Sequence, residues 1–232
     1  MQNPMRALNH LFANNRAWAD RIRIEDPQFF RKLSRQQAPE YFWIGCSDSR
    51  VPANQITGLL PGEMFVHRNV ANVVPLADLN CLSALQFAVD VLKVRHVIVC
   101  GHYGCAGVRA VLHGHRLGLV DNWLQNVAEV RQKHAAQLAG LGDEAQQFDR
   151  LCELNVIEQV VSVCNATSVQ GAWACGQPLV VHGWIYAVSD GLLRDLGLCV
   201  AGPGELAPAY QAAVAGLHAP LTPAVLIGDV RC

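Results

Sequence analysis

The 232-residue sequence is poor in charge: 16% of its residues are Asp, Glu, Lys or Arg, and the formal net charge is −1. This balance creates no overall field that would attract nucleic acid or an anionic membrane. No apolar run approaches the roughly 20 residues that span a bilayer, and residues 1–16 lack the apolar segment of a signal peptide. We therefore expect no nucleic-acid partner, no membrane partner and a cytoplasmic location.

The spacing of the nine cysteines matches no disulfide framework, and none of them form a C-x-x-C motif. Their number is odd and the chain is not small, so a secreted disulfide scaffold is a poor interpretation and a reducing compartment a better one. Free cysteine is among the most buried residue types, and we interpret most of these thiols as small core side chains. Only Cys46 and Cys105 receive a functional interpretation.

Hydrophobic residues make up 51% of the chain, enough for a sizeable core and for apolar surface that an oligomer would cover. Apolar strand-like segments alternate with helical patterns, which predicts one α/β domain around a mostly parallel sheet. Four strands are expected at 41–44, 63–69, 94–100 and 179–186, and an edge strand at 192–200 that suits antiparallel pairing. Helices are expected at 79–92, 106–112, 122–138 and 149–166.

The two ends of the chain are expected to differ from this pattern. Residues 1–36 read as a helical arm, with a break at Asn14-Asn15 and a short helix begun by Asp26-Pro27. Residues 203–232 contain four prolines and predict one short helix in an otherwise irregular tail. His113-Gly114-His115 resembles a metal pair but lies in a Gly-containing stretch without a nearby partner, and we interpret it as loop.

Two polar turns follow apolar strands, the place where α/β folds usually carry their chemistry. The first, from Cys46 to Arg50, reads C-S-D-S-R, and the second places His102 and Cys105 in an H-x-x-C spacing. Two thiolates and one imidazole suit Zn²⁺, and three protein ligands leave the fourth position open, as in catalytic zinc sites. A buried structural cysteine would explain the first turn alone, but not both turns together.

These motifs resemble the β class of carbonic anhydrases. The resemblance extends over roughly residues 18–196. It includes the segments C-S-D-S-R, H-R-N-V-A-N (67–72), D-L-N-C-L-S-A-L-Q, G-H-Y-G-C, C-E-L-N-V-I-E-Q and H-G-W-I-Y. It implies reversible hydration of CO₂ to bicarbonate and a proton by attack of a zinc-bound hydroxide. The implied assembly is a homodimer or homotetramer.

Carried over residue by residue, the resemblance assigns Cys46, His102 and Cys105 as zinc ligands. Asp48 and Arg50 become a catalytic dyad beside the metal, in which the arginine holds the carboxylate ionised. The resemblance also implies substrate contacts: the backbone N–H groups of Ala106 and Gly107 at a helix start, and Gln37 supplied by a partner subunit.

A subset of the family is switched by bicarbonate at a non-catalytic pocket. Its marks are a tryptophan three residues before the first zinc cysteine, an arginine on the next strand and a tyrosine on a later one. Here these are Trp43, Arg68 and Tyr186, with Gly45 leaving room. In the shut form Asp48 would leave Arg50 and become the fourth zinc ligand, so activity is expected to rise steeply with pH.

Three alternatives stay open on the sequence. Hydrolysis of carbonyl sulfide or carbon disulfide would use the same zinc set, because pocket shape decides the substrate. A structural zinc site closed by Asp48 would make the chain a binding module, although such a site needs no Arg50. A thiol redox protein is disfavoured by the absence of C-x-x-C.

Overall fold

The computed structural model describes residues 8–217. These residues divide into two compact units, with the boundary between Gln37 and Ala38. The first contains α1 (Asn9–Glu25) and α2 (Phe29–Leu33), with Trp18 and Phe30 edge to face at 5.6 Å. The predicted break at Asn14-Asn15 is wrong, because α1 runs through it: two exposed asparagines cost a helix little. The start predicted at Asp26-Pro27 is also wrong, because α2 begins at Phe29 and its N-cap residue, Gln28, makes no side-chain capping hydrogen bond. Asp26 instead accepts the Gln28 N–H within the turn that precedes the helix. That the chain is one domain stays a prediction.

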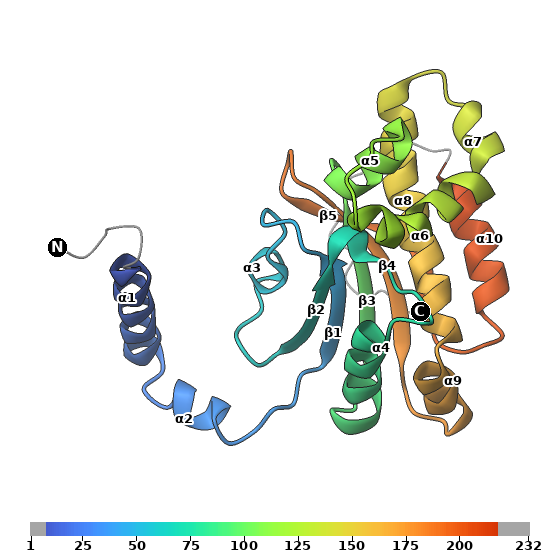
Figure 1. Ribbon diagram of the computed structural model, residues 1–232. Coiled ribbons are helices and arrows are strands. Elements are labelled where there is room, and N and C mark those ends of the chain that lie inside the picture. Colours follow the sequence, from blue (N-terminus) through green and yellow to red (C-terminus); the bar gives the residue numbers. More distant parts are fainter. Residues whose placement is uncertain (1–7, 218–232) are drawn as a thin grey trace. The chain divides into compact units, whose positions relative to one another are not determined.

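The second unit is an α/β fold built on a five-stranded sheet, which confirms the predicted fold class (Figure 1). The strands are β1 (Tyr41–Cys46), β2 (Met64–Asn69), β3 (His96–His102), β4 (Val180–Ala187) and β5 (Leu192–Val200). Their order is β2-β1-β3-β4-β5, and only β5 is antiparallel. Because β1 and β3 are parallel neighbours, the turns that follow them leave the same edge of the sheet.

Helices flank this sheet, mostly near the predicted ranges. They are α3 (Ala53–Thr57), α4 (Leu79–Gln86, continued by a π-turn over Phe87–Val91), α5 (Ala106–His113), α6 (Val120–Lys133), α7 (Ala135–Ala139), α8 (Glu144–Asn165), α9 (Thr167–Ala174) and α10 (Leu206–Gly216). The helix predicted at 122–138 is split at His134, whose backbone is not helical. The described part of the predicted tail, residues 203–217, contains one helix, α10; residues 218–232 lie outside the described part.

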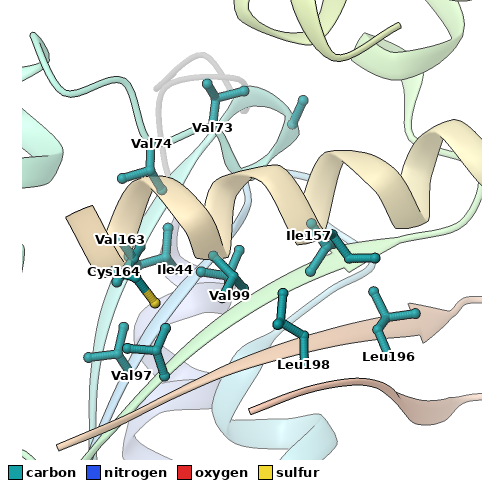
Figure 2. Packing of buried hydrophobic residues seen from close by; sticks show 14 of the residues in the cluster. Ile44, Val73, Val74, Val97, Val99, Ile157, Val163, Cys164, Leu196 and Leu198 are labelled. Carbon is teal, nitrogen blue, oxygen red and sulfur yellow. The ribbon is translucent and has the colours of Figure 1, made fainter. Parts of the chain in front are cut away.

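The core lies between the sheet and α8, whose side chains Ile157, Val163 and Cys164 turn toward the strands (Figure 2). This helix approaches the sheet closely because β3 has no side chain at Gly101. A Cβ there would lie 2.5 Å from a methyl carbon of Val156. The helix starts at an Asp143 cap, which accepts the Ala145 N–H.

None of the helices within residues 8–217 is both long enough and apolar enough to cross a bilayer.

Candidate metal centre

Cys46, His102 and Cys105 meet where β1 and β3 end, as the sequence predicted. Their ligand atoms all lie within 4.8 Å of one another, and the three residues are at most 5% exposed. The two sulfurs are 3.9 Å apart. Two thiolates about 2.3 Å from one tetrahedral zinc would be about 3.8 Å apart, so the observed spacing fits that ion.

The imidazole of His102 is oriented for metal binding. Its Nδ1 lies 3.0 Å from the carbonyl oxygen of Tyr103, which only accepts hydrogen bonds, so Nδ1 carries the proton. The lone pair is therefore on Nε2, and this buried atom has no hydrogen-bond partner among residues 8–217. Histidine ligands of metals characteristically donate their other ring N–H to such a carbonyl. An unsatisfied buried nitrogen beside two sulfurs fits a metal ligand.

The contact between the two sulfurs changes the acidity of both thiols. It lowers the pKa of Cys46 to about 4. The same contact, together with burial, raises the pKa of Cys105 well above its ordinary value. The backbone N–H groups of Asp48 and Ala71 also lower the pKa of the Cys46 thiol. A preformed thiolate is the state that binds metal.

Asp48 and Arg50 form a two-pronged ion pair at the mouth of the triad. Arg50 Nε donates to Asp48 Oδ1 at 2.9 Å, and its Nη2 donates to Oδ2 at 2.7 Å. These bonds from Arg50 hold the pKa of Asp48 well below its usual range, so the carboxylate is ionised. Oδ2 is also 3.8 Å from His102 Nε2, which places the charge beside the prospective ligand atoms.

Comparison with known proteins places this geometry in a family. A family model for carbonic anhydrase matches residues 41–193. A carbonic anhydrase of Emericella nidulans is 49% identical over 197 residues, covering 85% of this chain and 86% of the relative. The structure of a Coccomyxa β-carbonic anhydrase with acetazolamide superposes with a TM-score of 0.83 at 41% identity, covering 92% of this chain and 99% of that one. The chain belongs to the β-carbonic anhydrase family.

Two further comparisons agree with this assignment. A structure of tetrameric β-carbonic anhydrases from Sordaria macrospora gives a TM-score of 0.79 at 39% identity, covering 83% of this chain and 98% of that one. The Candida albicans carbonic anhydrase is 37% identical over 192 residues, which cover 82% of this chain and 68% of the relative. The chain is therefore an enzyme, a carbonic anhydrase with a Cys-His-Cys cluster that fits a metal.

The four residues expected to form a bicarbonate pocket lie near one another in this β-carbonic anhydrase. Trp43 and Gly45 share a face of β1, and a Cβ at position 45 would lie 2.2 Å from the Trp43 indole nitrogen. That nitrogen is buried and has no hydrogen-bond partner in the part of the chain that the structure describes. Arg68 pairs with Gly45 in register, and Tyr186 packs in the same apolar cluster as Trp43. Arg68 itself donates to the backbone oxygens of Cys46 (2.8 Å) and Asp48.

The predicted substrate contacts fall on two parts of the chain. Ala106 and Gly107 open α5 directly after Cys105, and Ala106 is exposed. Gly107 is buried, and a Cβ there would lie 3.1 Å from side chains of Val70 and Leu124. Gln37 belongs to the first unit, and its contact with substrate stays a prediction.

The sequence alone did not identify the residues that orient the prospective metal ligands. The hydroxyl of Tyr103 donates a hydrogen bond to Glu153 on α8 at 2.6 Å, and the carbonyl oxygen of Tyr103 accepts a hydrogen bond from His102. Asn155 and Gln159 on the same helix bond to the turn after β2. The available signal was three polar residues, Glu153, Asn155 and Gln159, inside a helix that is otherwise apolar on more than one face.

Proposed function

We propose that this carbonic anhydrase is a zinc enzyme whose metal is held by Cys46, His102 and Cys105. The observation that carries this proposal is the buried, unpartnered His102 Nε2 beside two sulfurs spaced for one tetrahedral ion. When bound, Zn²⁺ supplies a Lewis acid that makes a water molecule nucleophilic near neutral pH. The net reaction joins CO₂ and water and yields bicarbonate and a proton.

The chain's own groups would orient the reactants. Asp48 is acceptor-only while Arg50 keeps it ionised, so it accepts a hydrogen bond from the attacking water and directs a lone pair at the carbon of CO₂. The backbone N–H groups of Ala106 and Gly107, at the positive end of α5, would donate to substrate oxygens. Gln37 of the partner subunit would add a side-chain hydrogen bond to the substrate, as the family resemblance implies.

Stopped-flow CO₂ hydration by protein of measured zinc content tests this function. We expect fast turnover that a chelator abolishes and that added zinc restores, and we expect Cys105→Ser to lower both zinc content and rate. Absence of CO₂ turnover with zinc bound would contradict the proposal. Turnover of carbonyl sulfide or carbon disulfide would then identify the site as a hydrolase for sulfur analogues, and its absence would indicate a structural zinc.

We further propose that bicarbonate inhibits the enzyme at Trp43, Gly45, Arg68 and Tyr186. The support is the buried Trp43 N–H, which lacks an acceptor, beside a position where only glycine fits. Arg68 donates hydrogen bonds to the carbonyl oxygens of Cys46 and Asp48. An anion that binds Arg68 would compete with these bonds and would let the turn that carries Asp48 move. Asp48 would then leave Arg50 and take the fourth zinc position, which excludes water.

Inhibition kinetics decide this regulation. We expect bicarbonate inhibition in the unaltered enzyme and a steep rise in kcat/KM between neutral and mildly alkaline pH. Trp43→Phe removes the indole N–H and Arg68→Ala removes the guanidinium, so both should weaken inhibition. Unchanged inhibition in both variants would exclude the pocket, and full activity already at neutral pH would exclude the Asp48 switch.

We propose a homodimer or homotetramer, because the Sordaria macrospora relatives are tetrameric and several large apolar side chains of the described chain are exposed. Multi-angle light scattering would measure the mass, and a monomer at micromolar concentration would contradict this assembly.

A further inference from the structure

Two amide side chains are buried one turn apart on α8. Asn155 is 1% exposed and Gln159 is 4% exposed. A buried amide that lacks partners is costly, so each of these groups must be paired within the protein. Gln159 Nε2 donates to Asn155 Oδ1 at 3.2 Å. This bond pairs the amide nitrogen of Gln159 with the amide oxygen of Asn155.

The remaining groups of this pair bond to one backbone turn. Asn155 Nδ2 donates to the carbonyl oxygen of Ala71 at 2.9 Å, and Gln159 Oε1 accepts the N–H of Val74 at 2.7 Å. The segment from Ala71 to Val74 is therefore held at both ends by side chains more than 80 residues away in sequence. We call Asn155 and Gln159 the amide clasp.

The turn bound by the amide clasp has a backbone conformation that residues other than glycine rarely adopt. Ala71 has φ 65° and ψ 25°, and Asn72 has φ 48°, so both are left-handed. A residue with a Cβ pays free energy for this conformation and keeps it only where surrounding contacts impose it. Ala71 carries the greater penalty because its side chain has no polar group for a compensating local bond. The clasp supplies two such contacts.

Both ligand-bearing segments touch this turn. The Ala71 N–H faces the sulfur of Cys46, and the carbonyl of Asn69 accepts the Ser47 N–H at 2.8 Å. On the other side, a Cβ at Gly107 would lie 3.3 Å from the Ala71 Cβ, so the start of α5 after Cys105 rests against the same residue. A shift of Ala71 would displace the surroundings of both thiolates.

We propose that Asn155 and Gln159 are positioning residues of the metal centre: they impose the left-handed Ala71 turn, and that turn fixes the Cys46 and Cys105 ligand groups. This inference rests on the proposed zinc site. The clasp reaches the metal only through backbone, so it sets ligand geometry and contributes no ligand.

The test compares clasp variants with a variant of equal structural cost elsewhere. Asn155→Leu and Gln159→Met keep side-chain size and remove the hydrogen bonds. Leu198→Ala serves as the control, because Leu198 is fully buried on β5, at the opposite edge of the sheet from β2. Zinc affinity is measured by chelator competition, and ligand geometry by the absorption of the cobalt-substituted protein, where thiolate charge-transfer and d–d bands report coordination.

We expect the clasp variants to bind zinc about 10- to 100-fold more weakly and to change the cobalt spectrum. Leu198→Ala should leave both unchanged at a similar loss of stability. The proposal is overturned if Gln159→Met and Asn155→Leu match the unaltered protein in affinity and spectrum. It is equally overturned if Leu198→Ala weakens zinc as much as they do.

A second substitution isolates the turn itself. Glycine adopts the left-handed conformation without a Cβ penalty, so Ala71→Gly in the Asn155→Leu background should recover part of the lost affinity. Equal affinities with and without Ala71→Gly would show that the clasp does not act through this backbone conformation.

A metal-free readout separates the clasp from the zinc proposal. Hydrogen exchange of residues 69–74 in the apo protein should be faster in Asn155→Leu and Gln159→Met than in Leu198→Ala. If the unaltered protein bound neither zinc nor cobalt, the proposed zinc site would be excluded. The proposed role of the amide clasp at the metal would then be excluded as well. Faster exchange would then establish only that the clasp orders the turn, and equal exchange would exclude that as well.

Discussion

Tyr103 joins a prospective zinc ligand to the long core helix. Its carbonyl oxygen accepts the Nδ1–H of His102 at 3.0 Å, and its hydroxyl donates to Glu153 Oε1 at 2.6 Å. Burial, and then the neighbouring Glu153 charge, raise the pKa of the Tyr103 hydroxyl far above its ordinary value, so it stays a donor. Arg150 Nε donates to the other Glu153 oxygen at 2.8 Å. The imidazole is thus oriented by a residue that α8 holds in place.

Tyr103→Phe removes this hydroxyl and should destabilise the metal-free protein by about 1–3 kcal/mol, because Glu153 is left buried with one donor fewer. Urea unfolding of the single variants and of Tyr103→Phe/Glu153→Gln gives a double-mutant cycle. A coupling free energy above about 0.5 kcal/mol is expected for residues in direct contact. Purely additive losses would show that the hydroxyl and the carboxylate do not stabilise each other.

The guanidinium of Arg50 has a geometry that lysine cannot reproduce. Arg50 engages both oxygens of Asp48 through Nε and Nη2, whereas a lysine ammonium is a single point charge. If Asp48 orients the attacking water, Arg50→Ala should lower kcat/KM about 100-fold, at the lower end of the range for a positioned acid–base group. Arg50→Lys keeps the charge and should lower kcat/KM less, by about tenfold. Stopped-flow rates at equal zinc content measure this. Arg116→Lys, an exposed Arg-to-Lys change outside this pair, is the control.

The sequence predicted that the prospective metal ligands lie together, but it did not predict features that depend on tertiary contacts. Cys46, His102 and Cys105 were predictable because each follows an apolar strand, and parallel neighbouring strands bring such turns to one edge. The break at Asn14-Asn15 was predicted wrongly because helix propensity is a weak preference per residue. The split at His134 and the partners of Asn155 were not predictable, since both depend on tertiary contacts between segments far apart in the chain.

Glu158 anchors α10 to α8. It accepts hydrogen bonds from His134 Nε2 (2.8 Å), Lys133 Nζ (2.7 Å) and the hydroxyl of Tyr210 (2.7 Å). Burial alone would raise the pKa of Glu158, but these three donors outweigh it and lower the pKa to about 2. The ionised carboxylate therefore stabilises the folded state at neutral pH.

Glu158→Gln should lower the free energy of unfolding at pH 7 by an amount on the order of 3 kcal/mol. Because the folded pKa lies below the unfolded value of about 4.5, this contribution is complete above that value and is lost as the pH falls toward 2. The difference between the variant and the unaltered protein should therefore shrink below pH 5, which denaturant titrations can follow. Glu144→Gln, on an exposed glutamate of the same helix, should change little, and a constant difference across pH would contradict the assignment.

His182 and His96 form a second titrating pair, on β4 and β3. His96 Nδ1 is 3.0 Å from His182 Nε2, and burial, followed by the neighbouring His96, lowers the pKa of His182 to about 4. The unfolded chain binds this proton below about pH 6.5 and the folded chain does so only near pH 4, so stability falls as the pH drops through that interval. His182→Gln should remove this loss, on the order of 2 kcal/mol between pH 7 and pH 5. Unfolding free energies of the metal-free proteins at the two pH values test it, with the exposed His115→Gln as the matched control. Equal pH dependence in both variants would mean that His182 is protonated as readily in the folded state as in the unfolded chain.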